Sequence, residues 1–193
     1  MASNIVVVMA DQHRPDLLGP AITPNIDRLA GEGTTYSRVT CQGPLCMPAR
    51  ASFLTERYVR DHGVYSNWTE LDPRVWPTYL HALREAGYHT ALVGKAHLYR
   101  QEQHPAAHID ELAPLLEALG FAEVHESGDK FYGKTPNAYI DFLRAGGLVD
   151  DYDRHLADHS YQGEGETGRG ATKRVPMWDS TPAPVPLDAY IDA

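Results

Sequence analysis

A cysteine followed closely by a proline and an arginine is the strongest chemical signal in this sequence. Cys46 begins the stretch Cys-Met-Pro-Ala-Arg, which ends at Arg50. Proline favours the first turn of a helix, so we expect a helix to start at Pro48 and to run to residue 55. Cys46 would then lie where backbone N–H groups and the helix dipole attract an anion. Arg50 would add a fixed positive charge that stabilises an ionised nucleophile.

Two apolar runs, residues 4–10 and 88–94, predict strands that are buried on both faces. A helix is expected between them from Pro24, with Thr23 as its cap, and this alternation implies an α/β protein with a parallel sheet and right-handed crossovers. The other helices are predicted over 48–55, 75–86, 110–119 and 135–145, whereas 151–181 shows no regular pattern.

Polar residues directly follow both predicted strands. Asp11 and Gln12 come after the first strand, and their carboxylate and amide oxygens suit a hard cation. Lys95 and His97 come after the second strand, spaced so that an extended backbone puts both on one side. A cation and a proton carrier together can stabilise and protonate a departing oxygen. Because these sheets bind ligands beyond the carboxyl ends of their strands, we expect these residues at one site.

These motifs, in this order, resemble the N-terminal portion of the type I sulfatases, which depend on formylglycine and belong to the alkaline phosphatase superfamily. The cysteine motif with the following Leu54-Thr55-Glu56-Arg57 is similar to that family's maturation motif, although Glu56 replaces the usual glycine. Residues 23–30 and 94–97 resemble the family's Thr-Pro-Asn-Leu-Asp and Gly-Lys-x-His segments. The resemblance implies an alkaline-phosphatase-like, mixed but mostly parallel sheet flanked by helices.

The resemblance also implies a chemistry. A dedicated maturation enzyme would oxidise Cys46 to formylglycine, and the hydrated aldehyde would attack the sulfur of a small-molecule sulfate ester. The expected metal is Ca²⁺, with Mn²⁺ or Mg²⁺ as alternatives. The resemblance assigns catalysis to Cys46, Arg50, Lys95 and His97, and metal binding to Asp11, Gln12 and Cys46.

Asn67 leaves two interpretations open. It ends a stretch similar to the family's His-Gly-Val-x-x-Asn, and in the related phosphonate monoester hydrolases an asparagine near this point contacts the substrate. It could equally be a turn residue. The predicted function is therefore an arylsulfatase-like sulfuric-ester hydrolase. A phosphonate monoester or phosphodiester hydrolase and a catalytically inactive fragment or binding module remain as alternatives.

The amino-acid composition limits the classes of binding partner that we expect. The 193 residues carry a formal net charge of −9, which argues against nucleic acid and anionic membranes. The N-terminus lacks a basic region before its apolar run, so we expect a cytoplasmic protein. Two cysteines exclude a disulfide framework. The full-length protein could form a homo-oligomer.

Length completes the expectations. Sulfatases are usually more than twice this size, so residues 1–193 are expected to form the N-terminal part of a catalytic domain. Residues 1–99 would be the core with the motifs, and 100–193 would supply helices and loops that are truncated. The remaining metal ligands would then come from beyond Ala193.

Overall fold

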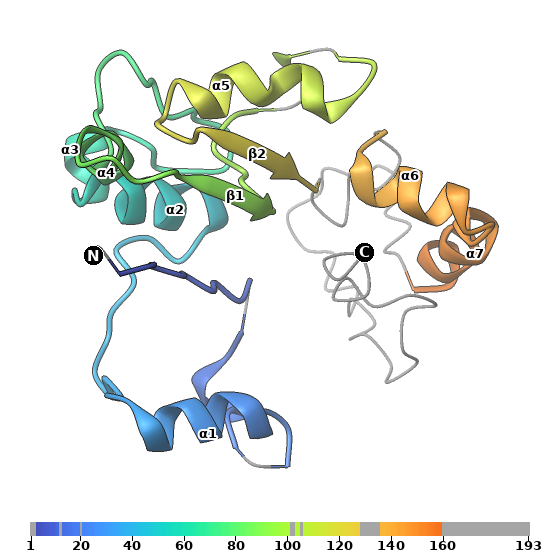
Figure 1. Ribbon diagram of the computed structural model, residues 1–193, viewed down its shortest axis with the longest axis horizontal. Helices are drawn as coiled ribbons and strands as arrows, with labels where there is room; N and C mark the ends of the chain where they lie inside the picture. Colours follow the sequence, from blue (N-terminus) through green and yellow to red (C-terminus); the bar gives the residue numbers. More distant parts are fainter. Residues whose placement is uncertain are drawn as a thin grey trace, which may run out of the picture.

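The computed structural model describes residues 3–11, 13–19, 21–100, 103–104, 106–127 and 136–159. Helices surround a small parallel sheet (Figure 1). In chain order the elements are η1 (Pro15–Leu17), α1 (Pro24–Glu32), α2 (Cys46–Thr55), α3 (Val59–His62), α4 (Tyr79–Glu85), β1 (Ala91–Gly94), η3 (Ile109–Leu112), α5 (Ala113–Glu117), β2 (Glu123–Glu126), α6 (Ala138–Ala145) and α7 (Val149–His159). No helix in these ranges is long and apolar enough to cross a bilayer.

Strands β1 and β2 pair in parallel, with Ala91 opposite Glu123 and Gly94 opposite Glu126. The chain passes from one to the other through η3 and α5, and α5 contacts β2. This connection is a β-α-β crossover, so the predicted α/β class and parallel pairing are confirmed. The prediction of a strand over 88–94 that is buried on both faces is wrong in detail. Side chains of β1 alternate between half-buried and exposed, so one face of the sheet packs and the other does not.

The hydrophobic core lies where α2, α4 and α5 meet the segment that follows β1. Leu116 of α5 and Met47 of α2 have no exposed surface, and Leu80 of α4 packs into the same cluster. Burial of such side chains is the main favourable term in folding, at about 1.5–3 kcal/mol each. The buried members of the core are Met47, Ala51, Leu54, Val64, Leu71, Leu80, Ala96, Leu98, Tyr99, Leu112, Leu116, Leu119 and Phe121.

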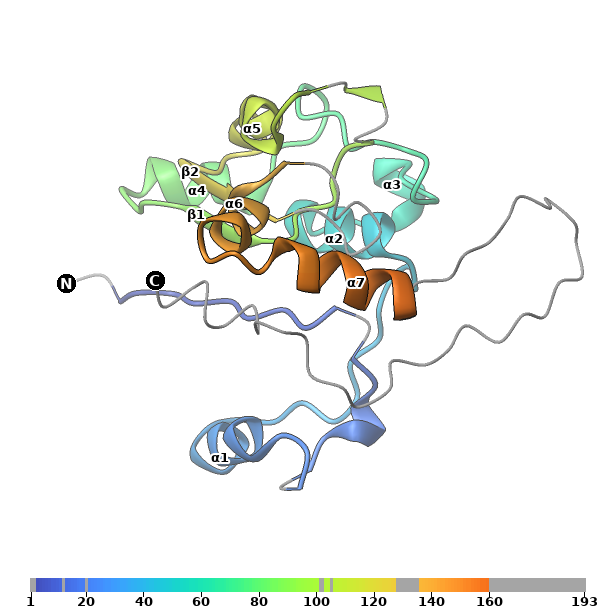
Figure 2. The same cartoon turned by 90° about the vertical axis from the view of Figure 1, so that its right-hand side faces the viewer.

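The N-terminal run does not form the predicted buried strand. Residues 4–10 have no strand assignment, and Val8 is 90% exposed. Figures 1 and 2 show this segment as an extended stretch outside the sheet. A β-branched run favours extended backbone, but a strand also needs a neighbour to bond its N–H and C=O groups. Within the described ranges the sheet consists of β1 and β2 alone.

Local signals located the helices well and their ends less well. Helix α1 starts at Pro24 as predicted, but Thr23 does not cap it, because its Oγ1 bonds the backbone of Gly19 instead. Helix α4 starts at Tyr79, four residues after the predicted start, because Thr78 and His81 form a capping box there. Helices η3, α5 and α6 fall within one to three residues of the predicted ranges.

Helix α7 contradicts the prediction of irregular structure over 151–181. It runs from Val149 to His159, and the rest of that predicted range lies outside the described residues. Many charged side chains hid its apolar stripe, which includes Tyr152 in edge-to-face contact with Tyr139 of α6.

Candidate active site

Cys46 is the first residue of helix α2, two residues earlier than the sequence predicted. Leu45, the residue before it, has extended backbone and no side chain that could cap the helix. The N–H of Met47 donates instead to Oδ1 of Asn67, at 3.0 Å, and Pro48 has no N–H to offer. At these two positions of the helix start, no free backbone N–H group is available for the anion that the sequence predicted there. Positive charge at Cys46 comes from side chains.

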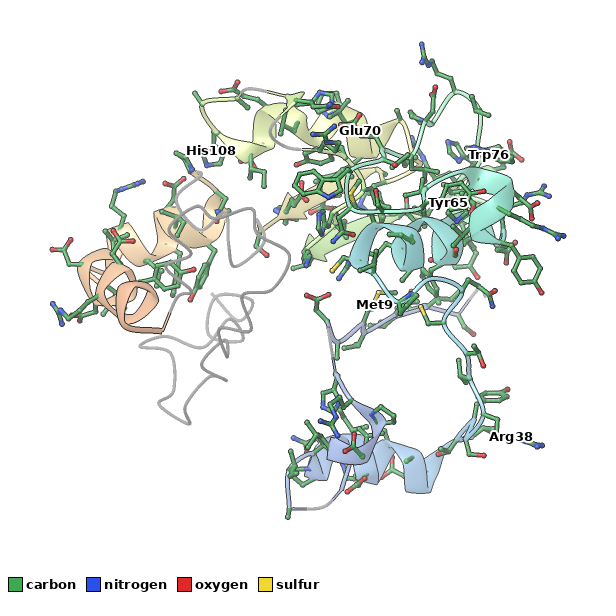
Figure 3. All side chains as sticks on the ribbon, turned by 180° about the vertical axis from the view of Figure 1, so that it is seen from behind. Met9, Arg38, Tyr65, Glu70, Trp76 and His108 are labelled. Atoms are coloured by element: carbon green, nitrogen blue, oxygen red, sulfur yellow. The ribbon has the colours of Figure 1, made fainter. Side chains whose placement is uncertain are left out.

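Three segments bring charged side chains to Cys46. Lys95, directly after β1, donates from Nζ to Oδ2 of Asp11 at 3.0 Å and lies 3.7 Å from Sγ of Cys46. Arg50, one turn into α2, lies with Nη2 3.3 Å from Oδ1 of Asp11. Cys46 Sγ lies 3.9 Å from the same Oδ1. Figure 3 shows Met9 below α2, which agrees with the contact between Asp11 and Arg50. Sequence reasoning placed these four residues at one site, and the structure brings them together.

Two cationic side chains and one carboxylate make up this cluster beside Cys46. Lys95 and Arg50 have side chains that are 16% and 12% exposed, and Asp11 is the carboxylate that both contact. Burial raises the pKa of Asp11, but hydrogen bonds and charges from Lys95 and Arg50 outweigh burial and hold it below its usual 3.8. Asp11 is therefore ionised at neutral pH. Lys95 and Arg50 thus place two positive charges near Cys46 and Asp11, and such charges suit an anionic substrate.

The turn after β1 controls where Lys95 lies. Arg50 donates from Nη1 to the backbone carbonyl of Lys95 at 2.6 Å. Gly94 has a φ of 99° and His97 a φ of 48°, so the chain is not extended through this turn. The alternation that put Lys95 and His97 on one side of a strand does not apply there. His97 is half-buried, and its catalytic role stays a prediction.

Asn67 lies beside the helix that carries the nucleophile position. Its carbonyl oxygen accepts the Met47 N–H, so it replaces the missing helix cap and fixes the residue next to Cys46. Asn67 also lies in a turn, as one of the two interpretations expected, since the Thr69 N–H donates to the Ser66 carbonyl across it. Its role in substrate binding stays a prediction.

Sequence reasoning missed Glu126, the last residue of β2. Its carboxylate lies against the turn that holds Lys95, where Oε1 accepts the Ala96 N–H at 3.3 Å. No apolar run marks its strand, because three of the four residues of β2 are polar, so the sequence carried no signal that would have identified Glu126.

The described residues supply only part of the ligand shell of a cation. Asp11 is ionised and can be a ligand of a hard cation, but both its oxygens contact cationic side chains. Gln12, the other predicted ligand of this segment, lies outside the described residues. Within the described part of the chain there is no group of three or more His, Cys, Asp or Glu that could hold a metal. Ca²⁺ takes roughly six to eight oxygen ligands, so these residues alone do not complete its shell.

A cysteine at the start of a helix, beside two cations and the turn after β1, is typical of α/β enzymes that act on anionic substrates. A sequence model of the family described as Sulfatase matches residues 3–162. The chain therefore belongs to the sulfatase family, and its α/β fold is of the alkaline-phosphatase-like class.

Individual relatives agree with the family assignment. The chain is 40% identical over 105 residues to a choline-sulfatase of Rhizobium meliloti, which covers 52% of this chain and 20% of the relative. It is 36% identical over 104 residues to an arylsulfatase of Clostridium perfringens, covering 51% and 22%. It is 38% identical over 105 residues to the multifunctional alkaline phosphatase superfamily protein PehA of Trinickia caryophylli, covering 47% and 20%. The matches thus span about a fifth of each relative's length.

Proposed function

We propose that this chain supplies the nucleophile-bearing part of a sulfuric-ester hydrolase of arylsulfatase type. The observation that carries the proposal is the convergence of two cationic side chains, those of Lys95 and Arg50, on Cys46 and on Asp11 beside it. Sulfate esters are anions, and further negative charge develops on the departing oxygen, so fixed cations stabilise the transition state. Membership of the sulfatase family and the sulfatase relatives support the same function.

We propose that Cys46 is converted to formylglycine by a maturation enzyme. Its Cys-x-Pro-x-Arg context and its partly exposed place at the start of α2 support this conversion. The hydrated aldehyde would supply the attacking oxygen. Lys95 and Arg50 would hold that group and the sulfate oxygens, because both cations already converge on residue 46 or on its neighbour Asp11. His97 would give a proton to the departing ester oxygen.

The proposed function includes a divalent metal for which residues 1–193 would supply only some of the ligands. Asp11 would be one ligand, with Gln12 and residue 46 as further ligands, and Ca²⁺ is the metal that their oxygens suit best. When bound, the cation would polarise the sulfate. The other ligands would come from sequence outside residues 1–193, which we propose form the N-terminal part of a catalytic domain, with its motif-bearing core in 1–99. Cytoplasmic location and self-association also stay predictions.

A phosphonate monoester or phosphodiester hydrolase is the second candidate. The relation to PehA, a protein described as multifunctional, favours it, and so does Asn67 next to the nucleophile position. Both reactions would use the same charged cluster. Comparison of kcat/KM for an aryl sulfate and an aryl phosphonate monoester would separate them, because the better substrate has the better-stabilised transition state.

The central test uses the complete gene product, with whatever sequence flanks residues 1–193 in its gene, co-expressed with a formylglycine-generating enzyme. Peptide mass spectrometry should show the aldehyde at residue 46, and the protein should hydrolyse para-nitrophenyl sulfate. Cys46→Ala should abolish turnover, and Cys41→Ala is the matched control because Cys41 is exposed and bonds only locally, to the Gly43 carbonyl. Fully active protein with an unmodified Cys46 thiol would contradict the proposed nucleophile.

A further inference from the structure

A buried carboxylate lies directly behind the turn that carries Lys95. Glu126 ends β2 and is 6% exposed. Its Oε1 accepts the N–H of Ala96 at 3.3 Å, and its Oε2 accepts the hydroxyl of Tyr99 at 2.6 Å. The backbone of His97 also hydrogen-bonds this carboxyl. One side chain therefore holds two successive peptide groups of the turn and a side chain just beyond it.

The turn needs such holding because its backbone is not regular. Gly94 and His97 both have positive φ, and a residue other than glycine is uncommon there. Strand pairing ends at Gly94, whose carbonyl accepts the Ser127 N–H at 3.1 Å. Beyond that point the turn is held on one side by Arg50, at the Lys95 carbonyl, and on the other by Glu126.

Burial of the Glu126 carboxyl costs free energy, and its neighbours offset this cost. Burial raises the pKa of Glu126, and hydrogen bonds from Tyr99, His97 and Ala96, together with the charge of Arg50, offset that rise only in part. A buried carboxyl is expensive unless every partner is in place. Within the described part of the chain, the Glu126 carboxyl accepts its hydrogen bonds from residues that follow Lys95. The free-energy cost of burying it is therefore offset at this one turn.

We propose that Glu126 is a positioning residue for the active site, which keeps the Lys95 ammonium on Cys46 and Asp11 by fixing the backbone of residues 96 and 97. Glu126 does not touch the substrate. It acts through Lys95, whose Nζ lies 3.7 Å from Cys46 Sγ and 3.0 Å from Asp11 Oδ2. The proposal rests on the proposed function for its kinetic test, and a second test is independent of turnover.

The kinetic test is a double-mutant cycle in the complete, matured protein with para-nitrophenyl sulfate as substrate. Glu126→Ala should lower kcat/KM by about 10- to 100-fold, since a misplaced catalytic group costs about that much. In a background that carries both Lys95→Ala and His97→Ala, the same change should cost less than about threefold, because Glu126 bonds the backbone of the turn that carries both residues. An equal loss in both backgrounds would mean a purely structural role and would overturn the proposal.

Conservative and control variants make this cycle specific. Glu126→Gln keeps an oxygen that can accept the Ala96 and His97 N–H groups, and its amide can donate to Tyr99, so it should recover most of the loss. Failure of Glu126→Gln to recover activity, in protein that unfolds at the wild-type temperature, would refute positioning by hydrogen bonds. Glu123→Ala is the matched control on the same strand, because Glu123 is exposed and contacts His89 and His125.

The independent test uses protein made without the maturation enzyme, so that Cys46 remains a thiol, in a Cys41→Ser background. Iodoacetate is an anion and iodoacetamide is neutral, so the ratio of their alkylation rates at Cys46 reports the positive charge held beside this residue. That ratio should fall at least about threefold in Lys95→Ala and in Glu126→Ala, with no further fall in the double variant. An unchanged ratio in Glu126→Ala would overturn the proposal. Wild-type protein that lacks sulfatase activity but shows this pattern would refute the proposed function alone.

Discussion

Replacement of Asp11 by Asn tests whether the charged cluster serves chemistry or stability. Asp11 holds Lys95 at 3.0 Å and Arg50 at 3.3 Å and is the carboxylate that both cations contact. It ends a segment that is mostly exposed and outside the sheet. The variant keeps the size and shape of the side chain but removes its charge. It removes the negative charge that Lys95 and Arg50 both contact, and it withdraws the carboxylate that we assign to the metal.

The structural cost of this change should be small. Asp11 is 36% exposed, so water screens both ion pairs, and exposed pairs contribute about 0.2–1 kcal/mol each. With some repulsion between the two remaining cations, we expect the free energy of unfolding to fall by about 1–2 kcal/mol. The chemical cost should be much larger. Loss of an ordering carboxylate and of a charged metal ligand should lower kcat/KM and metal affinity by about 100-fold or more.

The stability difference between the wild type and Asp11→Asn should depend on pH in a definite direction. Burial raises the pKa of Asp11, but Lys95 and Arg50 lower it further, so its folded-state pKa lies below the usual 3.8. Its contribution is then complete above pH 3.8 and disappears as the pH falls through the lower folded-state value. The difference in unfolding free energy between wild type and Asp11→Asn should therefore shrink in acid.

The assays are urea unfolding at several pH values, metal analysis after dialysis, and hydrolysis of an aryl sulfate, all with the complete gene product. A loss of stability above about 4 kcal/mol would show that Asp11 determines the fold, contrary to its exposure. Unchanged metal content and unchanged kcat/KM would refute its assignment as ligand and as partner of Lys95.

Three further predictions follow from single contacts. Arg50→Lys should lower kcat/KM by about tenfold in the aryl sulfate assay, because one ammonium cannot replace a guanidinium that bonds both the Lys95 carbonyl and Asp11; wild-type activity would contradict this. Asn67→Ala should cost about 1 kcal/mol in urea unfolding, since it leaves the Met47 N–H without its acceptor, and Asn67→Asp should retain most of that stability. Leu116→Ala should cost about 2–5 kcal/mol, against less than about 1 kcal/mol for the exposed Leu29→Ala, because Leu116 has no exposed surface.

The parts of the structure that were predictable are those set by local physics or by chain order. Pro24 and Pro48 marked the beginnings of helices α1 and α2 to within two residues. The contact between Asp11 and Lys95 was predicted from polar residues that follow apolar runs, although the run before Asp11 lies outside the described sheet.

The predictions that were wrong have a common physical cause. Each concerns a segment whose conformation or burial depends on contacts with residues far away in the sequence. Residues 4–10 have strong strand propensity but no neighbour in the described sheet, so propensity alone misled. The left-handed backbone of His97 depends on contacts made by Arg50 and Glu126, which lie 47 and 29 residues away in the numbering. Glu126 itself looks like any exposed acidic residue until its burial is known.

The long separation between Asp11 and Lys95 also has a consequence for the order of folding. These residues are 84 apart in sequence, and Asp11 is still 35 from Cys46 once α2 is in place. Closing a flexible loop of that second length costs roughly 3 kcal/mol in chain entropy. Two screened ion pairs return only about 1–2 kcal/mol, so Asp11 cannot nucleate folding. We expect it to join after α2 and β1 have packed and to leave early on unfolding, together with the cation of which we propose it is a ligand. Loss of bound metal should thus precede loss of helical signal on heating.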